Sequence, residues 1–202
     1  MAENTPITIY TADCIGNAAN CLYPNEVKIT DDFSAKLAFA TDMVCARYKN
    51  NYRNTANFEV ANALPGDCDN DHSEDPADWV TPADVCAAFP GITFAVHYSR
   101  NHMREKNGKP ARPKFHVLFP IEYITDAVAY SEMKKLVNAI FPYFDAKALD
   151  AARFFFGTAN PEVELYQGGM TLSEYLYGDD FDADMPNNAQ TIPEGSRNAT
   201  MS

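Results

Sequence analysis

Residues 64–71 read Leu64-Pro65-Gly66-Asp67-Cys68-Asp69-Asn70-Asp71, and the rest of the chain is organised around them. Asp67 and Asp69 lie two residues apart, so on a strand their carboxylates point to the same face, about 6–7 Å from each other. Two like charges at that separation repel each other unless a cation lies between them. The pair therefore predicts oxygen ligands for Mg²⁺ or Mn²⁺ at the end of a strand.

The Asp-x-Asp pattern has two other interpretations. A calcium loop beginning at Asp67 needs glycine at its sixth position and glutamate at its twelfth, where this chain has His72 and Asp78. This mismatch disfavours a calcium site. A surface acidic loop without a function is also compatible with the pattern, and that alternative stays open.

The composition is that of a globular chain. With 202 residues, 46% of them hydrophobic and 12% aromatic, one domain with a sizeable core is expected. No run approaches the ~20 apolar residues of a transmembrane helix, and the first residues lack the basic start and apolar run of a secretory signal. Five cysteines without Cys-x-x-Cys spacing disfavour a disulfide framework and a zinc site. These features predict a cytoplasmic protein with reduced thiols.

The charge is unevenly distributed. A net charge of −12 disfavours binding to nucleic acid, whose affinity for proteins depends largely on phosphate neutralisation. However, residues 67–78 carry six acids and no base, whereas residues 100–114 carry six bases against Glu105. Local charge decides what a groove attracts. The alternative is that both segments are only solvated loops.

Periodicity and capping signals predict the order strand–helix–strand–strand–helix–strand over residues 58–157. The expected elements are a strand over 58–67, a helix from Thr81 to about Phe89, strands over 92–98 and 114–121, a helix over 125–140 and a strand over 153–157. This is the order of the split βαβ, or ferredoxin-like, motif. Its first and third strands are central neighbours, so Asp67 and Asp69 are expected to face the same region as His116.

The flanking segments complete the expected fold. They comprise a strand over 5–10, a loop over 11–26, a helix from Thr30 or Asp31 to Thr41 with Phe33, Leu37 and Ala40 on its apolar face, strands over 43–48 and 163–166, and a helix over 171–177. The expected fold class is therefore α/β (α+β), with an N-terminal α/β extension and one mixed, mostly antiparallel sheet.

A row of donors precedes and enters the strand at 114–121. Alternation places Lys114 and His116 on one face, and Arg112 lies one step further along. Three cationic or donor groups at period two are suited to holding a triphosphate. Ser99 and Arg100 end the preceding strand, where they are placed to reach the same phosphates.

Other polar residues have less specific interpretations. A lone strand histidine is more often structural than catalytic, and His97 and His102, which lie outside the row, are expected to be structural or at the surface. The segment Lys49-Asn50-Asn51-Tyr52-Arg53 suits stacking on a nucleic-acid base, but is equally typical of an ordinary amphipathic loop.

A third acidic site, Leu149-Asp150, follows the second predicted helix. A third carboxylate that converges on Asp67 and Asp69 provides enough charge for a two-metal site. Arg153 can balance that charge or hold a substrate phosphate. Asp145 competes for the same role, although the hydrophobic-Asp pattern favours Asp150. Together these signals predict phosphoryl transfer on a nucleotide.

Three segments, Asp67-Cys68-Asp69, Lys114-Phe115-His116 and Leu149-Asp150, resemble the three motifs of the archaeo-eukaryotic primase superfamily. The likeness covers roughly residues 40–170 and is greatest to primase-polymerase domains of phages, plasmids and integrated mobile elements. Lys114 stands where that family more often has a small residue.

The resemblance implies a ferredoxin-like (RRM-like) catalytic core. It also implies a metal-dependent nucleotidyltransferase that extends a 3′-hydroxyl with nucleoside triphosphates on a single-stranded DNA template. The implied metal ligands are Asp67, Asp69 and Asp150, with His116 on the phosphates of the nucleotide and Arg112, Lys114 and Arg153 assisting.

The C-terminal segment carries a second likeness. Residues 192–200, Ile-Pro-Glu-Gly-Ser-Arg-Asn-Ala-Thr, look like the opening of the small helical domain that follows the core in mobile-element primases and often leads to a helicase. We therefore expect a catalytic domain over 1–177, then an acidic linker and a truncated helical domain over 178–202. Such a chain would be the N-terminal piece of a longer replication protein, with a helicase in the same or a neighbouring chain.

Two other functions are compatible with parts of the sequence. A non-catalytic replication-initiation module that binds DNA is disfavoured by three clustered carboxylates. A metal-dependent glycosyltransferase acting on a nucleotide-sugar leaves the row at His116 unexplained.

Overall fold

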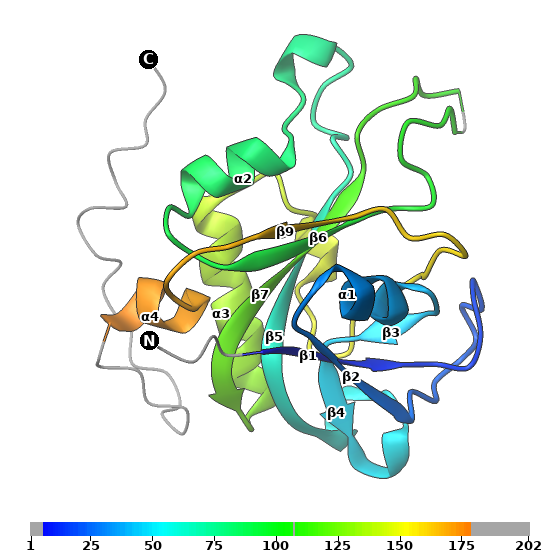
Figure 1. Ribbon diagram of the computed structural model, residues 1–202, viewed down its shortest axis with the longest axis vertical. Coiled ribbons are helices and arrows are strands. Elements are labelled where there is room, and N and C mark those ends of the chain that lie inside the picture. Colours follow the sequence, from blue (N-terminus) through cyan, green and yellow to red (C-terminus); the bar gives the residue numbers. More distant parts are fainter. Residues whose placement is uncertain (1–5, 107, 179–202) are drawn as a thin grey trace.

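The computed structural model describes residues 6–106 and 108–178, and its strands form two antiparallel sheets (Figure 1). The larger sheet has the order β4-β5-β7-β6-β9, and the smaller has the order β2-β1-β3-β8. The strands are β1 (Ile7–Thr11), β2 (Asn25–Ile29), β3 (Met43–Val44), β4 (Ala46–Tyr48), β5 (Phe58–Cys68), β6 (Phe94–Tyr98), β7 (Phe115–Ile124), β8 (Phe154–Phe155) and β9 (Val163–Tyr166). The α-helices are α1 (Asp32–Phe39), α2 (Pro82–Ala88), α3 (Ala127–Ile140) and α4 (Leu172–Tyr177). The expected α+β class is confirmed, with two sheets in place of one.

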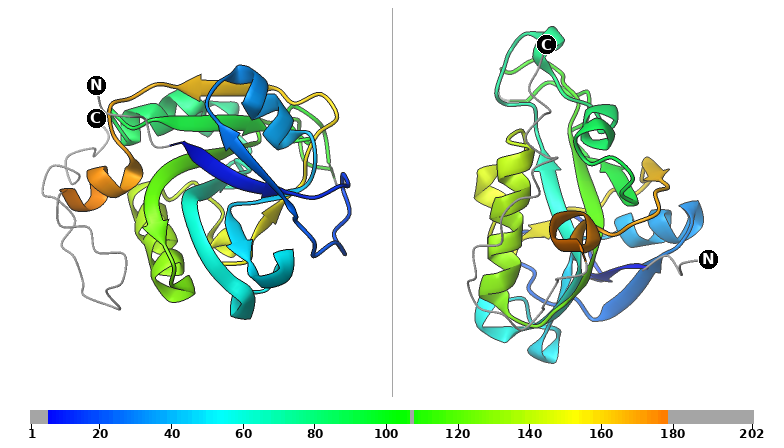
Figure 2. Two further views of the ribbon diagram at one scale, coloured as in Figure 1. Left: turned by 60° about the horizontal axis from the view of Figure 1, so that its bottom comes forward. Right: turned by 90° about the vertical axis from the view of Figure 1, so that its left-hand side faces the viewer.

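The larger sheet is covered on both faces. Helix α3 packs on one face, whereas α1 and the smaller sheet lie over the other (Figure 2). One hydrophobic cluster, which includes Phe119 and Tyr130, lies on the α3 side. A second cluster, which includes Ile9, Phe39 and Leu118, fills the space between the two sheets. Because β7 is covered on both faces, its consecutive residues Val117, Leu118 and Phe119 are all apolar and buried, and Leu118 belongs to the second cluster whereas its two neighbours belong to the first.

The two central strands each contain a proline. Pro65 in β5 and Pro120 in β7 cannot donate a ladder hydrogen bond. Each lies where its strand has a single neighbour, because β4 pairs with β5 only up to Ala61 and β6 pairs with β7 only up to Leu118. Both prolines therefore lie beyond the part of their strand that pairs with a second neighbour.

The expected ferredoxin-like order is realised in part. β5, α2, β6, β7 and α3 follow one another as predicted, and β5 and β7 are neighbours. The predicted strand over 153–157 is β8, which pairs with β3 in the smaller sheet, so β4 takes the edge beside β5. Asp42 Oδ1 accepts the Gly157 N–H at 3.0 Å, and a Cβ on Gly157 would lie 2.3 Å from backbone atoms of Thr41. This close contact ties the segment to the smaller sheet.

Two strands differ from the expected ranges. The strand expected over 43–48 breaks at Cys45 into β3 and β4, which belong to different sheets. β2 begins inside the segment expected to be a loop over 11–26, where it pairs with β1 along its whole length. The N-terminal part therefore contributes more sheet than its Asn- and Gly-rich sequence indicates.

Helix α1 presents a different face from the expected one. Its cap is Asp31, as predicted, but Phe33 and Leu37 are 72% and 52% exposed. The buried residues of α1 are Ala35, Ala38 and Phe39. Small alanines let the helix approach the sheet closely, and a periodicity argument weighted by large apolar residues selects the opposite face. In the helix expected over 125–140, Val128 was also an expected apolar-face position, and at the start of α3 it is 60% exposed.

Most of the expected C-terminal region lies outside the described residues. The predicted linker and helical domain occupy 178–202, and only Gly178 of that range is described. The domain division therefore stays a prediction. Within residues 6–106 and 108–178, no helix has the length and apolar character required to cross a bilayer.

Candidate active site

Three polar side chains, distinct as a set from the row of donors, lie side by side across the larger sheet and are termed the row. Asp67 on β5 is directly opposite His116 on β7, and His116 is directly opposite His97 on β6. Opposed residues on neighbouring strands share one face. This is the face toward the smaller sheet, because Phe39 of α1 contacts the ring of His97 and Phe155 of β8 contacts the ring of His116. The convergence of Asp67 and His116 that the strand order predicts is confirmed.

The same register continues past the strand ends as a ladder of acid–base pairs. Its three pairs are Asp67 Oδ1 with His116 Nε2 at 3.6 Å, Asp69 Oδ1 with Lys114 Nζ at 2.9 Å, and Asp71 Oδ1 with Arg112 Nη1 at 3.4 Å. Side chains at period two on one segment meet side chains at period two on the other. The acidic motif and the row of donors, predicted separately from the sequence, are two sides of one ladder.

Asp67 is the buried member of the acidic pair. Its side chain is 8% exposed, and its Oδ2 accepts a hydrogen bond from Arg153 Nη2 at 2.9 Å. Burial, and next the neighbouring Asp69 carboxylate, raise the pKa of Asp67 to about 6, although Arg153 acts in the opposite direction. The local charge on this carboxylate is therefore incompletely balanced by the protein.

Arg112 anchors the acidic loop. It is 1% exposed, and its Nη1 donates to the carbonyl oxygens of Asn70 at 2.8 Å and Ser73 at 3.3 Å. Its guanidinium also lies 5.6 Å from the ring centroid of Trp79. These contacts engage the Arg112 guanidinium with the acidic loop. A contact between Arg112 and the nucleotide stays a prediction.

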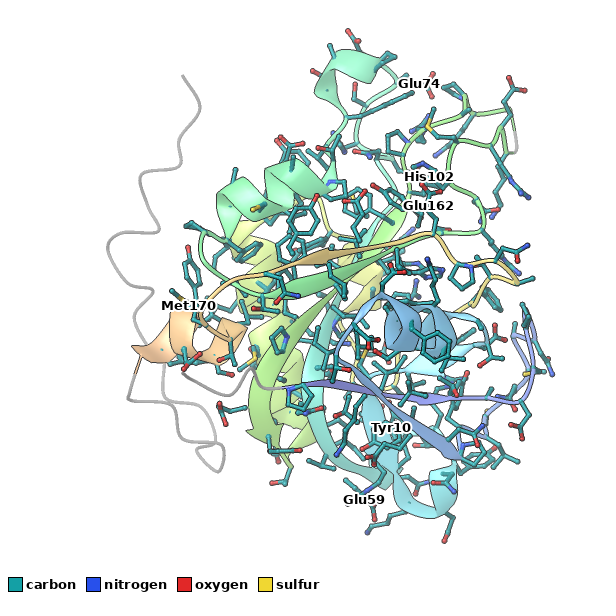
Figure 3. The ribbon with its side chains drawn as sticks, in the orientation of Figure 1. Tyr10, Glu59, Glu74, His102, Glu162 and Met170 are labelled. Carbon is teal, nitrogen blue, oxygen red and sulfur yellow. The ribbon has the colours of Figure 1, made fainter. Side chains whose placement is uncertain are left out.

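The acidic and cationic loops partly neutralise each other. Glu74 of the first and His102 of the second lie at the same end of the molecule (Figure 3). Lys109 Nζ lies 3.2 Å from Asp71 Oδ2. Within the described part of the chain, three bases of the cationic loop form no ion pair with a carboxylate: Arg100, Arg104 and Lys106. The positive charge open to a ligand is thus smaller than the sequence indicates.

Ser99 and Arg100 lie at the base of the cationic loop. The Ser99 N–H donates to the carbonyl oxygen of Lys114 at 2.9 Å. The Arg100 guanidinium carbon lies 3.9 Å from the ring centroid of Phe156. Phe156 follows β8, so Arg100 connects the loop to the smaller sheet. Contact of either residue with nucleotide phosphates stays a prediction.

The two candidates for the third carboxylate have different surroundings. The Asp145 N–H donates to the Asp67 carbonyl oxygen at 2.7 Å, and the charge of Asp145 is among those that raise the pKa of Asp67. Asp150 is exposed, its Oδ1 accepts the Ala152 N–H at 2.8 Å, and its carbonyl oxygen accepts from Lys134 Nζ at 2.7 Å. The structure thus places Asp145 beside the row, and the assignment of Asp150 still rests on the sequence.

The donor set at the row fits a divalent cation. In the described ranges, no group of three or more His, Cys, Asp or Glu side chains is arranged to hold a metal ion. Mg²⁺, however, is commonly bound through one or two carboxylates, with waters and substrate phosphates completing its coordination. Asp67 and Asp69 supply two carboxylates, and the raised pKa of Asp67 indicates a site that a cation would stabilise. A site with three carboxylates stays a prediction.

His97 was expected to be structural or at the surface, and the structure places it in the interior, beside His116 on the neighbouring strand. It is 0% exposed and contacts His116 directly, with 3.3 Å between the two Nδ1 atoms. The pairing of β6 with β7 brings the rings together, and the long loop over 99–114 hides that register in the sequence.

Comparisons with known proteins gave one structural likeness. No protein-family model and no curated protein matches the sequence. Among solved structures, the fold is similar to the AEP domain of the cyanophage S-2L primase-polymerase, with a TM-score of 0.44 and 15% sequence identity over 90% of this chain and 87% of that one.

Proposed function

We propose that this chain is a metal-dependent nucleotidyltransferase domain of the primase or primase-polymerase type. It would add nucleotides to a 3′-hydroxyl on a single-stranded DNA template. The observation that carries the proposal is the pair of adjacent acid–base contacts, Asp67–His116 and Asp69–Lys114, with Arg153 beside them. This set combines two carboxylates for a divalent ion with three donors for phosphate oxygens.

Each residue has a separable role in the proposal. Asp67 and Asp69 would hold the ion, and bound Mg²⁺ or Mn²⁺ would neutralise triphosphate charge. Lys114 and Arg153 donate to these carboxylates in the structure, and phosphate oxygens are competing acceptors for the same donors. Burial lowers the pKa of His116 to about 4, so His116 would act as a neutral N–H donor. Positioning and charge neutralisation of this kind dominate catalysis of phosphoryl transfer.

The test is incorporation of labelled nucleotides on a single-stranded template, with and without a primer, in Mg²⁺ and in Mn²⁺. The wild-type chain is expected to extend the primer. The double variant Asp67→Asn/Asp69→Asn is expected to lose incorporation while keeping its circular dichroism spectrum. The matched control is Asp32→Asn, which changes an exposed carboxylate paired with Lys36 on α1. Full activity in the double variant would exclude the proposed site.

The same assay separates the proposal from a non-catalytic replication-initiation module. Such a module would bind single-stranded DNA without incorporating nucleotides under any metal condition. A helicase partner, a phage or mobile-element origin and a linker over 178–202 remain predictions from the sequence.

A further inference from the structure

We propose that His97 is a positioning residue that fixes the tautomer of His116, so that His116 presents an N–H group at Nε2 toward Asp67 and the proposed nucleotide site. The inference rests on the proposed function only for the identity of the ligand. The tautomer of His116 itself is inferred from contacts of four buried or half-buried side chains, those of Asp67, His97, Phe39 and Thr158.

The contact between the two histidines requires one shared proton. His97 Nδ1 and His116 Nδ1 are 3.3 Å apart, and both rings are buried, with exposures of 0% and 8%. Two bare nitrogens at that distance would repel each other, and two N–H groups would clash. One ring must therefore donate from Nδ1 while the other accepts at Nδ1.

The opposite edge of His116 decides which ring donates. His116 Nε2 lies 3.6 Å from Asp67 Oδ1. If His116 donated from Nδ1, its neutral ring would turn a bare Nε2 toward a carboxylate, and lone pairs would face each other. If His97 donates, His116 carries its proton on Nε2, and an N–H group faces the carboxylate. The second arrangement is the stable one while Asp67 is ionised.

The surroundings of His97 support the same arrangement. Its ring stacks on Phe39 with centroids 4.6 Å apart and planes inclined by 9°. Its Nε2 lies 3.1 Å from Thr158 Oγ1. A hydroxyl can donate as well as accept, so Thr158 can donate to the bare Nε2 of His97. The Thr158 N–H in turn donates to the Phe39 carbonyl oxygen at 3.0 Å, which holds the hydroxyl in place.

The ordering belongs to a pair of neutral rings. Both imidazoles are buried, and burial disfavours the charged form of a histidine. A hydrogen bond from a neighbouring side chain to one imidazole nitrogen is a common way for proteins to set which of the two nitrogens is protonated. The consequence here is a donor at His116 that persists at neutral pH and is fixed in direction before a ligand binds.

The direct readout is the protonation of each imidazole nitrogen. Long-range ¹H–¹⁵N correlation spectra of protein labelled in its four histidines distinguish a protonated from a bare ring nitrogen. We expect His116 to be protonated at Nε2 and His97 at Nδ1 in the free protein at pH 7. A spectrum that shows His116 protonated at Nδ1 would overturn the inference, whether or not the protein binds nucleotides.

Variants at His97 test the cause of the ordering. His97→Phe retains an aromatic ring for Phe39 but removes the donor, and should convert His116 to a mixture of tautomers. His97→Asn places an amide nitrogen near the position of Nδ1 and should restore the Nε2–H form, whereas His97→Gln should not. Thr158→Val is a second route that leaves both rings in place, and it should also weaken the preference for one tautomer.

The functional readout is equilibrium binding of a non-hydrolysable deoxynucleoside triphosphate analogue with Mg²⁺. His97→Phe is expected to weaken binding about tenfold or more, the usual effect of losing a hydrogen bond to a charged group, and His97→Asn to recover most of it. His72→Phe is the control, because His72 is an exposed histidine outside the row. An unchanged His116 tautomer in both His97→Phe and Thr158→Val would overturn the inference. A wild-type protein with the expected tautomers that binds no nucleotide would instead contradict the proposed function.

Discussion

At the scale of single residues, Gly66 shows why the central segment has its sequence. A Cβ on Gly66 would lie 2.7 Å from the ring of Phe144, which is 5% exposed and packs against the rings of Phe119 and Phe141. The glycine therefore lets Phe144 pack on β5, next to the place where the Asp145 N–H meets the Asp67 carbonyl oxygen. Packing of the core and placement of an acidic residue beside the row depend on the same missing side chain.

Gly66→Ala should consequently destabilise the protein. Overpacking of a closed core costs about 1–3 kcal/mol, and urea unfolding followed by circular dichroism would measure it. Gly169→Ala is the matched control, because no heavy atom lies within 4 Å of its added Cβ. Equal midpoints for the two variants would show that Phe144 adapts without cost.

Asp67 makes a second residue-scale prediction, on pH. Its pKa is about 6 in the folded chain against 3.8 in a model peptide, so the unfolded chain ionises first as pH rises. As the pH rises from about 4 to about 6, the free energy of unfolding therefore falls relative to that of a chain with a neutral side chain at position 67. Above about pH 6 it falls no further. Asp67→Asn is expected to raise the free energy of unfolding at pH 7 by about 1–3 kcal/mol, with no gain below pH 4. A variant less stable than wild type at pH 7 would mean that the contact with Arg153 outweighs burial.

At the scale of elements, Asp42 joins three segments that flank strands of the smaller sheet. Its carboxylate accepts the N–H groups of Gly16 at 2.7 Å, Asn17 at 2.9 Å and Gly157 at 3.0 Å. The residue is 0% exposed. It holds the loop after β1, the turn before β3 and the segment after β8 against one another.

Asp42→Ala would leave the buried Gly157 N–H without its acceptor, whereas the N–H groups of Gly16 and Asn17 belong to exposed residues that water can reach. An unsatisfied buried group costs about 1–3 kcal/mol, so we expect a loss of about that size in chemical denaturation. Asp32→Ala, which removes an exposed carboxylate of α1, should change stability by less than about 0.5 kcal/mol. A small effect at Asp42 would show that water replaces the carboxylate.

Elements were predicted best where local signals and topology agree. The meeting of Asp67 with His116 follows from the order of β5, α2, β6 and β7, since that order makes the first and third strands neighbours. The partner of β8 was not predictable in this way. It depends on Gly157 approaching the backbone of Thr41, a tertiary contact with no local signature. The exposed face of α1 was mistaken because alanines carry little weight in an apolar pattern.

At the scale of the whole molecule, the net charge of −12 conflicts with binding to DNA unless a few open cations make the contact. The proposed function requires such cations, and in the cationic loop Arg100, Arg104 and Lys106 are the candidates, since its other bases pair with acids. Each phosphate contact on a single strand contributes roughly 0.7 to the slope of log K against log salt. We expect weak binding with a slope of about 2 for this chain.

Fluorescence anisotropy with a labelled single-stranded oligonucleotide over a range of salt concentrations would measure that slope. Arg100→Gln/Arg104→Gln should reduce both the affinity and the slope, whereas Arg47→Gln, in an exposed pair with Glu59, should change neither. A slope far above 3 would locate the main DNA contacts elsewhere on the chain.

We propose that Asp67 and Asp69 hold a divalent ion together with a nucleotide. The decisive experiment counts bound Mn²⁺ by electron paramagnetic resonance, with and without a non-hydrolysable nucleoside triphosphate. We expect nucleotide-dependent Mn²⁺ binding to the wild-type chain, and its loss in Asp67→Asn/Asp69→Asn but not in Asp32→Asn. Equal nucleotide-dependent Mn²⁺ binding by the wild type and the double variant would contradict it.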